Sequence, residues 1–180
     1  MFPQIAARLG GPAVLGLLYA APGFGSMLVS QTSSWTRHVH HHGRAIALAV
    51  CGWGIAIGAF GFAPNLALAV LALAAAGASD MVSGLFRMTM WNQSIPARVR
   101  GRMAGLEMIS YSTGEPLGNV EAGAIATLTG SVRLAVVSGG VLSILGAAIV
   151  SLALPALWRY DARTVRPAAE PEAQVAAAGL

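Results

Sequence analysis

The sequence contains no lysine and little charge of either sign. Its 180 residues include 11 arginines and 7 acidic residues, and only 10% of the chain is charged, whereas soluble domains are about 25% charged. Since 56% of the residues are hydrophobic, too few polar side chains are present to cover a surface exposed to water. The composition therefore predicts a membrane protein with several spans. The absence of lysine also excludes a phosphate-binding loop of the GxxxxGK[ST] type.

Histidine and cysteine do not form the patterns of a catalytic or metal site. All four histidines, His38, His40, His41 and His42, lie in one segment, so none is expected at membrane depth as a base for a serine nucleophile. Adjacent histidines also do not suit converging metal ligands, and a solvated loop is expected instead. Cys51 is the one cysteine and forms no internal disulfide. We predict that the chain is not an enzyme and holds no cofactor or metal.

Five apolar segments follow one another along the chain, each close to the roughly 20 residues that a helix needs to cross a bilayer. They predict an all-α membrane protein with transmembrane helices at 13–30, 45–63, 66–94, 103–128 and 134–157. Residues 1–12 are expected to form a non-cytoplasmic interfacial segment. Residues 158–180 are rich in proline, alanine and glutamate and predict a disordered cytoplasmic tail. In the second helix, Gly54 and Gly58 form a GxxxG pattern, which predicts close packing against another helix.

The arginines are distributed unequally between the two ends of the predicted helices. Five spans place eight arginines on one side, against Arg8 and Arg133 on the other. Because cytoplasmic loops carry an excess of basic residues, the side with eight is expected to face the cytoplasm. The arginines flank apolar spans, so no nucleic-acid partner is expected. The eight are Arg37, Arg44, Arg98, Arg100, Arg102, Arg159, Arg163 and Arg166.

The third predicted helix carries Asp80 and Arg87 within an otherwise apolar segment. Charges near the centre of a membrane cost about 2.5–3.5 kcal/mol each, so they are expected to face other helices or a water-filled cavity. The two residues lie two turns apart on one face, about 10.5 Å along the helix axis. Arg87 is therefore expected to pair with an acid of another helix or to lie near the cytoplasmic end. A cavity lining and a structural network both remain open for these residues.

The fourth predicted helix is the most polar of the five. Glu115 and Asn119 are four residues apart and share a face, where a cavity lining and structural hydrogen bonding are both open. Glu121 points to a different side, and a structural role is equally open. Glu107 is expected to pair with an arginine of the preceding basic segment, which is predicted to be a cytoplasmic loop. The predicted substrate-binding or coupling residues are Asp80, Arg87, Glu115, Asn119 and Glu121, and the predicted loop residues are Arg98, Arg100, Gly101 and Arg102.

The order and spacing of these residues resemble a known transporter family. The first span contains Gly16-Leu-Leu-Tyr-Ala-Ala-Pro-Gly23, and the basic loop after it ends in Gly43-Arg44. Further along come Asp80-Met-Val-Ser83 with Arg87, Pro96 with Arg100-Gly-Arg102, then Glu115, Gly118, Glu121, Gly123 and Arg159-Tyr-Asp161. The pattern is similar to the C-terminal part of exporters of the major facilitator superfamily, in the branch that contains the enterobactin exporter.

The resemblance implies that the five helices correspond to helices eight to twelve of a twelve-helix transporter, which binds substrate between two halves. It implies proton-coupled efflux of siderophores or drug-like molecules across the bacterial inner membrane. No counterpart of the first six helices is present, so we expect a fragment. Its expected partners are the lipid bilayer, a small-molecule substrate, protons and the missing N-terminal half. An alternative is a non-transporting membrane interaction protein that packs against a partner helix bundle.

Overall fold

The computed structural model describes residues 5–6, 11–95 and 97–158, and five long helices account for most of them. These are α2 (Pro12–Gln31), α3 (His42–Phe62), α4 (Leu66–Ser94), α5 (Ala97–Thr129) and α6 (Val132–Ala153). A 3₁₀-helix, η1 (Ser33–His38), joins α2 to α3, and the short helix α7 (Pro155–Trp158) follows α6. No β-strand occurs in the described ranges. Most of the predicted N-terminal segment, and the predicted tail from 159 onward, lie outside the described residues.

Short polar turns set the starts of α4 and α6. The Asn65 side-chain oxygen accepts a hydrogen bond of 2.9 Å from the Leu68 N–H, and the Ser131 hydroxyl accepts one of 3.3 Å from the Leu134 N–H. Both bonds satisfy a backbone donor that the first helical turn leaves unpaired. Gly130, between α5 and α6, has a φ of 66°, which glycine adopts without steric cost. Each of these short turns reverses the direction of the chain. The helices that they connect, α3 with α4 and α5 with α6, therefore pack side by side in antiparallel orientation.

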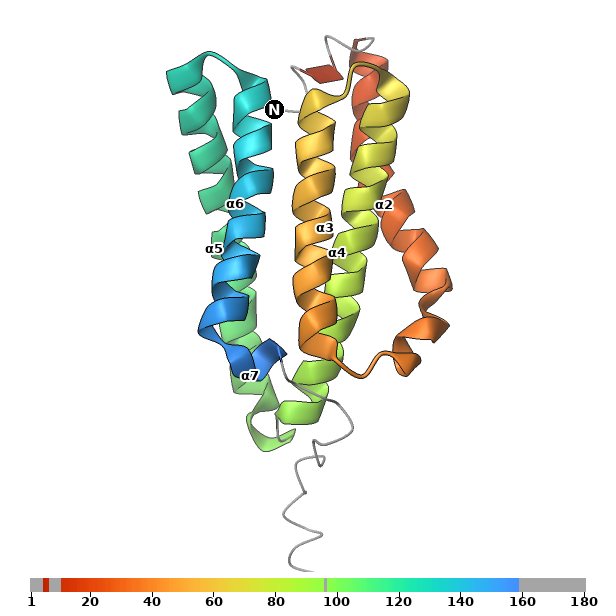
Figure 1. Cartoon of the computed structure of the whole chain (residues 1–180), viewed down its shortest axis with the longest axis vertical. Coiled ribbons are helices and arrows are strands. Elements are labelled where there is room, and N and C mark those ends of the chain that lie inside the picture. Colours follow the sequence, from red (N-terminus) through yellow and green to blue (C-terminus); the bar gives the residue numbers. More distant parts are fainter. Residues whose placement is uncertain (1–4, 7–10, 96, 159–180) are drawn as a thin grey trace, which may run out of the picture.

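α3 lies in the middle of the bundle, packed against α4 on one side and α6 on the other (Figure 1). α2 packs against α4 at one edge, and α5 packs against α6 at the other. The buried core joins Leu18 of α2, Phe60 of α3, Leu73 of α4 and Val136 of α6. None of the described side chains of α5 belongs to this core. α5 is therefore the helix with the least support from the rest of the chain.

Glycines bring the inner helices into backbone contact. A Cβ on Gly54 of α3 would meet the carbonyl oxygen of Gly140 on α6, and a Cβ on Gly140 would meet that of Gly54. At the α2–α4 crossing, a Cβ on Gly25 would meet the Ala74 backbone. There the Ser26 hydroxyl also donates a hydrogen bond of 2.9 Å to the Gly77 carbonyl. The close packing predicted for Gly54 is confirmed, and it follows the small-residue rule of membrane helices.

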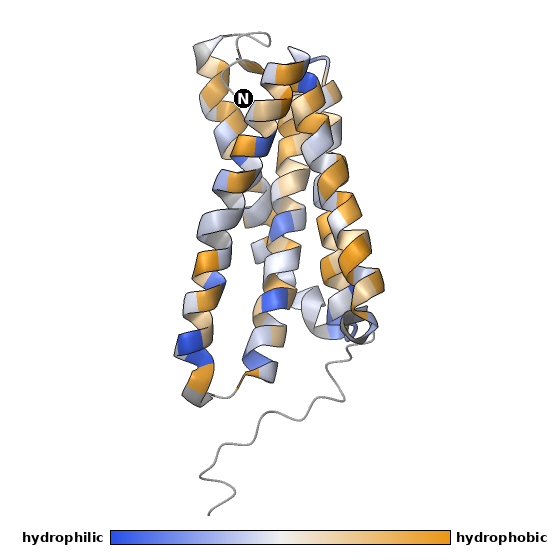
Figure 2. Cartoon of the chain, turned by 90° about the vertical axis from the view of Figure 1, so that its left-hand side faces the viewer, coloured by the Kyte–Doolittle hydropathy of each residue, from blue (hydrophilic) through white to orange (hydrophobic). Residues whose placement is uncertain are grey.

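The prediction of an all-α membrane protein is confirmed. Among the described residues, α2, α3, α4 and α6 are long and apolar enough to cross a membrane. α5 is longer than any of them, but it carries three glutamates and three arginines. Figure 2 shows mostly apolar ribbon along the bundle, with hydrophilic residues near its lower end and at a few positions higher up. The fourth predicted span, which corresponds to α5, is thus a helix of different character from the other four.

The predicted cytoplasmic loop is wrong in its secondary structure. α5 begins at Ala97 rather than 103, so Arg98, Arg100, Gly101 and Arg102 lie in its first turns. Arginine is a good helix former, and a proline directly before a helix does not interrupt its hydrogen bonds. The helix therefore extends back to Ala97.

Two further boundaries differ from the prediction. α6 ends at Ala153 rather than 157, because a residue that precedes a proline, here Leu154 before Pro155, is disfavoured in helical conformation. His42 is not in a solvated loop. It is the buried first residue of α3, where its ring packs 5.2 Å from the Phe86 ring.

Candidate functional site

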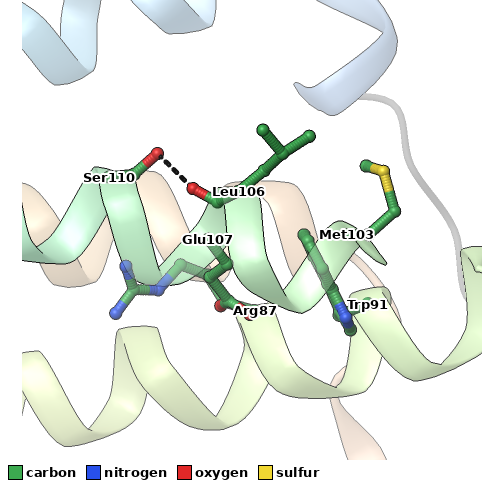
Figure 3. A pocket seen from close by; sticks show the side chains of 6 residues that line it. All are labelled: Arg87, Trp91, Met103, Leu106, Glu107 and Ser110. Atoms are coloured by element: carbon green, nitrogen blue, oxygen red, sulfur yellow. Dashed lines mark hydrogen bonds between the residues drawn. The ribbon is translucent and has the colours of Figure 1, made fainter. Parts of the chain in front are cut away.

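Two adjoining cavities of about 450 Å³ each open between α4 and α5, near the end of the bundle where these helices join. The first is lined by Arg87, Trp91, Met103, Leu106, Glu107 and Ser110 (Figure 3). The second is lined by Arg87 and Glu107 again, with Met81, Gly84, Leu85, Met88, Ala104 and Met108. The cavities exist because α5 packs mainly against α6 and makes few contacts with this part of α4.

Arg87 and Glu107 bring opposite charges to the wall that the two cavities share. Their side chains lie together between α4 and α5 (Figure 3); Arg87 is exposed and Glu107 is half-buried. Arg87 was expected near an acid of another helix, and the structure places it beside one. Glu107 was expected beside an arginine of the loop, but it faces Arg87 of α4 instead.

Arg100, one of the predicted loop arginines, contacts the end of α4. The guanidinium of Arg100 donates to the carbonyls of Asn92, at 3.4 Å, and Ile95, at 3.3 Å. These carbonyls belong to the last turn of α4 and to the residue after it. A cation is favourable at that end of a helix, where carbonyl groups lack helical partners. Arg100 therefore ties the start of α5 to the end of α4.

Methionine is concentrated around the charged pair. Met81, Met88, Met103 and Met108 line the cavities, and they are four of the seven methionines in the chain. A methionine side chain is flexible and polarizable, which suits surfaces that bind ligands of varied shape. Trp91 adds one aromatic face. The site can therefore hold an apolar ligand with a polar group directed toward Arg87 and Glu107.

A larger cavity of about 720 Å³ lies between α3, α4, α5 and α6. Its walls are mostly apolar, with Trp53, Phe60, Leu73 and Leu142 among the lining residues. Its polar groups come mainly from α5. They are Asn119 and Glu121, joined by Ser143 of α6. This chemistry resembles that of small-molecule sites, which are mostly apolar with a few fixed polar groups.

The predicted site residues do not form a single site in the structure. Arg87 lines the two cavities between α4 and α5, whereas Asn119 and Glu121 line the larger cavity. Asp80 is exposed on α4, next in sequence to Met81 of the second cavity. Glu115 lies within α5, and its side chain is outside the described part of the structure.

Glu121 was expected on a different side of the helix from Asn119, yet both border one cavity. The cavity is wide enough, and extends far enough around α5, to reach both residues.

The sequence predicted a pair between Glu107 and an arginine of the basic segment. It gave no indication that Trp91 and the methionines line a cavity. A periodic signal for Glu107 was present, since Ala104, Glu107 and Met108 share the i, i+3, i+4 face of a helix. Whether Trp91 lines a cavity depends on where α5 lies relative to α4, and the sequence of a single helix does not determine this. Only the tertiary arrangement of α4, α5 and α6 brings these residues to the same cavities.

No family model matches the chain, and no solved structure does. The chain is similar to proteins named as enterobactin exporters. It is 33% identical over 148 residues, 82% of its length, to enterobactin exporter EntS of Escherichia coli O81 and to that of Shigella flexneri. It is 32% identical over 140 residues, 78% of its length, to the EntS of Citrobacter koseri.

The chain spans about a third of the length of these relatives, from 34% to 36%. Their names describe transporters, which fits the prediction that the chain is not an enzyme. The similarity supports an exporter-like membrane chain, in agreement with the apolar helices of the structure.

Proposed function

We propose that the chain is part of a secondary exporter. In this exporter it forms one of the two sides between which the substrate passes. In this proposal the transporter moves siderophores or drug-like small molecules across the bacterial inner membrane and is driven by protons. The observation that carries the proposal is the similarity to enterobactin exporters over 82% of the chain. The cavities support it, because Arg87 of α4 and Glu107 and Glu121 of α5 border them.

Each charged group has a proposed role. Arg87 binds an anionic or hydroxyl-rich part of the substrate, since its guanidinium presents a planar set of donors. Glu107 competes for the same guanidinium, so binding of a proton to Glu107 releases Arg87 to the substrate. Asn119 and Glu121 hold polar groups of the substrate in the larger cavity, with Glu115 and Asp80 as further coupling residues. The methionines and Trp91 accommodate its apolar parts.

The rest of the transporter completes the site. About two thirds of the length of the relatives has no counterpart in this chain, and we propose that it supplies the opposing N-terminal half. Transporters of this architecture bind substrate between two halves that rock against each other. The end of the bundle at which α3 begins, α4 ends and α5 begins is proposed to face the cytoplasm. It carries Arg44, Arg100 and Arg102, while Arg133 lies at the start of α6 at the opposite end.

Efflux from inverted membrane vesicles tests the proposal. Vesicles containing the full-length transporter should accumulate a fluorescent substrate only when a proton gradient is imposed. The Glu107→Gln variant cannot exchange the coupling proton, and Glu121→Gln removes a charged acceptor for the substrate. Each should reduce the initial rate about tenfold or more, since loss of an interaction with a charged group costs about 1.5–3 kcal/mol. Arg102→Gln, an exposed site in the same helix, is the matched control and should retain the rate. Undiminished gradient-driven accumulation by the double glutamate variant would refute these roles.

The alternative is a membrane interaction protein without transport activity. One observation favours it, namely the weak support of α5, which exposes Leu117, Val120 and Leu128 with 67%, 70% and 86% of their surface accessible. A partner helix bundle would cover this face. Vesicles with no gradient-driven accumulation, combined with a stoichiometric membrane partner in detergent extracts, would favour this function over export.

A further inference from the structure

A further cavity is lined by residues of η1, α3 and α4. η1 lies on the side of the bundle away from α5 (Figure 1). The cavity has a volume of about 530 Å³. Exposed Arg44 and His41 border it, together with Trp35, of which 40% is accessible. Apolar residues of α3 and α4, including Leu48, Val82 and Phe86, form the rest of the lining. The cavity is therefore amphipathic, with cationic and aromatic groups beside an apolar wall.

The aromatic part of this cavity is firmly built. Phe86 is only 2% accessible, and the Trp35 ring meets it edge-on with the ring centroids 6.0 Å apart. His42 packs against the same Phe86 ring from the start of α3. These contacts hold Trp35 against Phe86 of α4, so this wall of the cavity is built by packed aromatic rings.

Arg44 is placed to bind an anion at the edge of the cavity. Its guanidinium carbon lies 5.6 Å from the centroid of the Trp158 ring in α7, a cation–π contact. A cation–π contact does not use up the N–H donors of a guanidinium, which stay available to a phosphate. The exposed His41 side chain adds a second nitrogen-bearing group at the same edge.

The position of the cavity identifies the source of the anion. α3 begins at His42 and α4 ends at Ser94, and both helices are long and apolar enough to cross a membrane. A membrane span that begins with α3 would place this cavity at the level of lipid headgroups, where tryptophan and arginine are enriched. Basic pockets between membrane helices at this level bind acidic headgroups.

We propose that this cavity binds an acidic phospholipid. Arg44 and His41 contact the phosphodiester, and one acyl chain lies along Leu48 and Val82. The proposal concerns none of the residues assigned to transport and stands whether or not the chain exports a substrate.

Quenching of Trp35 fluorescence by brominated lipids tests this proposal. The full chain is prepared with Trp53, Trp91 and Trp158 replaced by phenylalanine, which leaves Trp35 as the one tryptophan and keeps an aromatic ring beside Arg44. It is reconstituted in phosphatidylcholine vesicles that contain either brominated phosphatidylglycerol or brominated phosphatidylcholine. The ratio of quenching by the two lipids gives the relative affinity of the site for the acidic lipid.

We expect stronger quenching by the acidic lipid, and a loss of about fivefold in relative affinity in Arg44→Gln, the effect of about one arginine near an anionic surface. Arg133→Gln is the matched control, because Arg133 makes a similar contact with Phe62, at 5.7 Å, at the other end of the bundle. It should leave the ratio unchanged. Equal quenching by both lipids, or an undiminished preference in Arg44→Gln, would overturn the proposal. Relief of quenching by inorganic phosphate would assign the site to a free anion and would also overturn it.

Discussion

Two glycines of α2 occupy different environments although they lie two residues apart. Gly25 is buried against the Ala74 backbone, whereas Gly23 is exposed and has open space where a Cβ would lie. Gly25→Ala should destabilise the bundle by about 1–3 kcal/mol, because the added methyl group forces α2 away from α4. Gly23→Ala should be neutral or stabilising by up to about 1 kcal/mol, since alanine favours a helix. Thermal unfolding in detergent measures both, and equal effects would contradict the close crossing.

At this scale the sequence predicted some contacts and missed others for a physical reason. Gly54 was predicted to pack because the GxxxG spacing is local to one helix. Its partner Gly140 sits in Val-Ser-Gly-Gly-Val, which shows no such pattern and becomes meaningful only when α6 lies against α3. The same holds for Glu107, whose neighbour Arg87 belongs to a different helix. Partners across helices depend on rotation and tilt, which side-chain spacing within one helix does not determine.

α5 is the element whose insertion should depend most on its neighbours. Its three glutamates oppose transfer into lipid, and each charge near the centre costs about 2.5–3.5 kcal/mol. When single helices are placed in a host protein and tested for insertion by the translocon, α6 should insert and α5 should not. Replacement of Glu115 and Glu121 by leucine should make α5 insert, with an apparent gain of about 5 kcal/mol or more.

The matched control for α5 is Glu107→Leu. Glu107 lies ten residues from the start of α5 and Glu121 eight from its end. The single replacement therefore removes one comparably placed charge, and it should give about half the effect of the double variant. Insertion of unmodified α5 as efficient as that of α6 would show that its acids need no shielding by other helices.

Helix existence was predictable because the apolar runs are long, but helix ends were less so. α4 occupies Leu66–Ser94, and α6 stops before Pro155. The start of α5 was misplaced because a run of arginines was read as a loop. Charge indicates contact with water or headgroups, and it does not by itself interrupt a helix.

For the molecule as a whole, the class of fold could be predicted and the shape of the site could not. Hydrophobic composition and charge distribution indicate an all-α membrane protein before any contact is known. The cavities arise because α5 packs on α6 and stands away from α4, and nothing in the sequence of α5 alone specifies that arrangement. The predicted residues Arg87, Asn119 and Glu121 therefore fall in two separate cavities.

Substrate protection of an engineered cysteine tests the central claim, that the cavities between α4 and α5 lie on a substrate path. In full-length transporter with Cys51→Ala, cysteine is introduced either at Ser110, which lines the first cavity, or at Leu128, which is exposed near the far end of α5. Alkylation rates are measured with and without a transported compound. The account predicts that the compound slows alkylation severalfold at 110 and leaves 128 unchanged. Equal rates at 110 with and without the compound would contradict it.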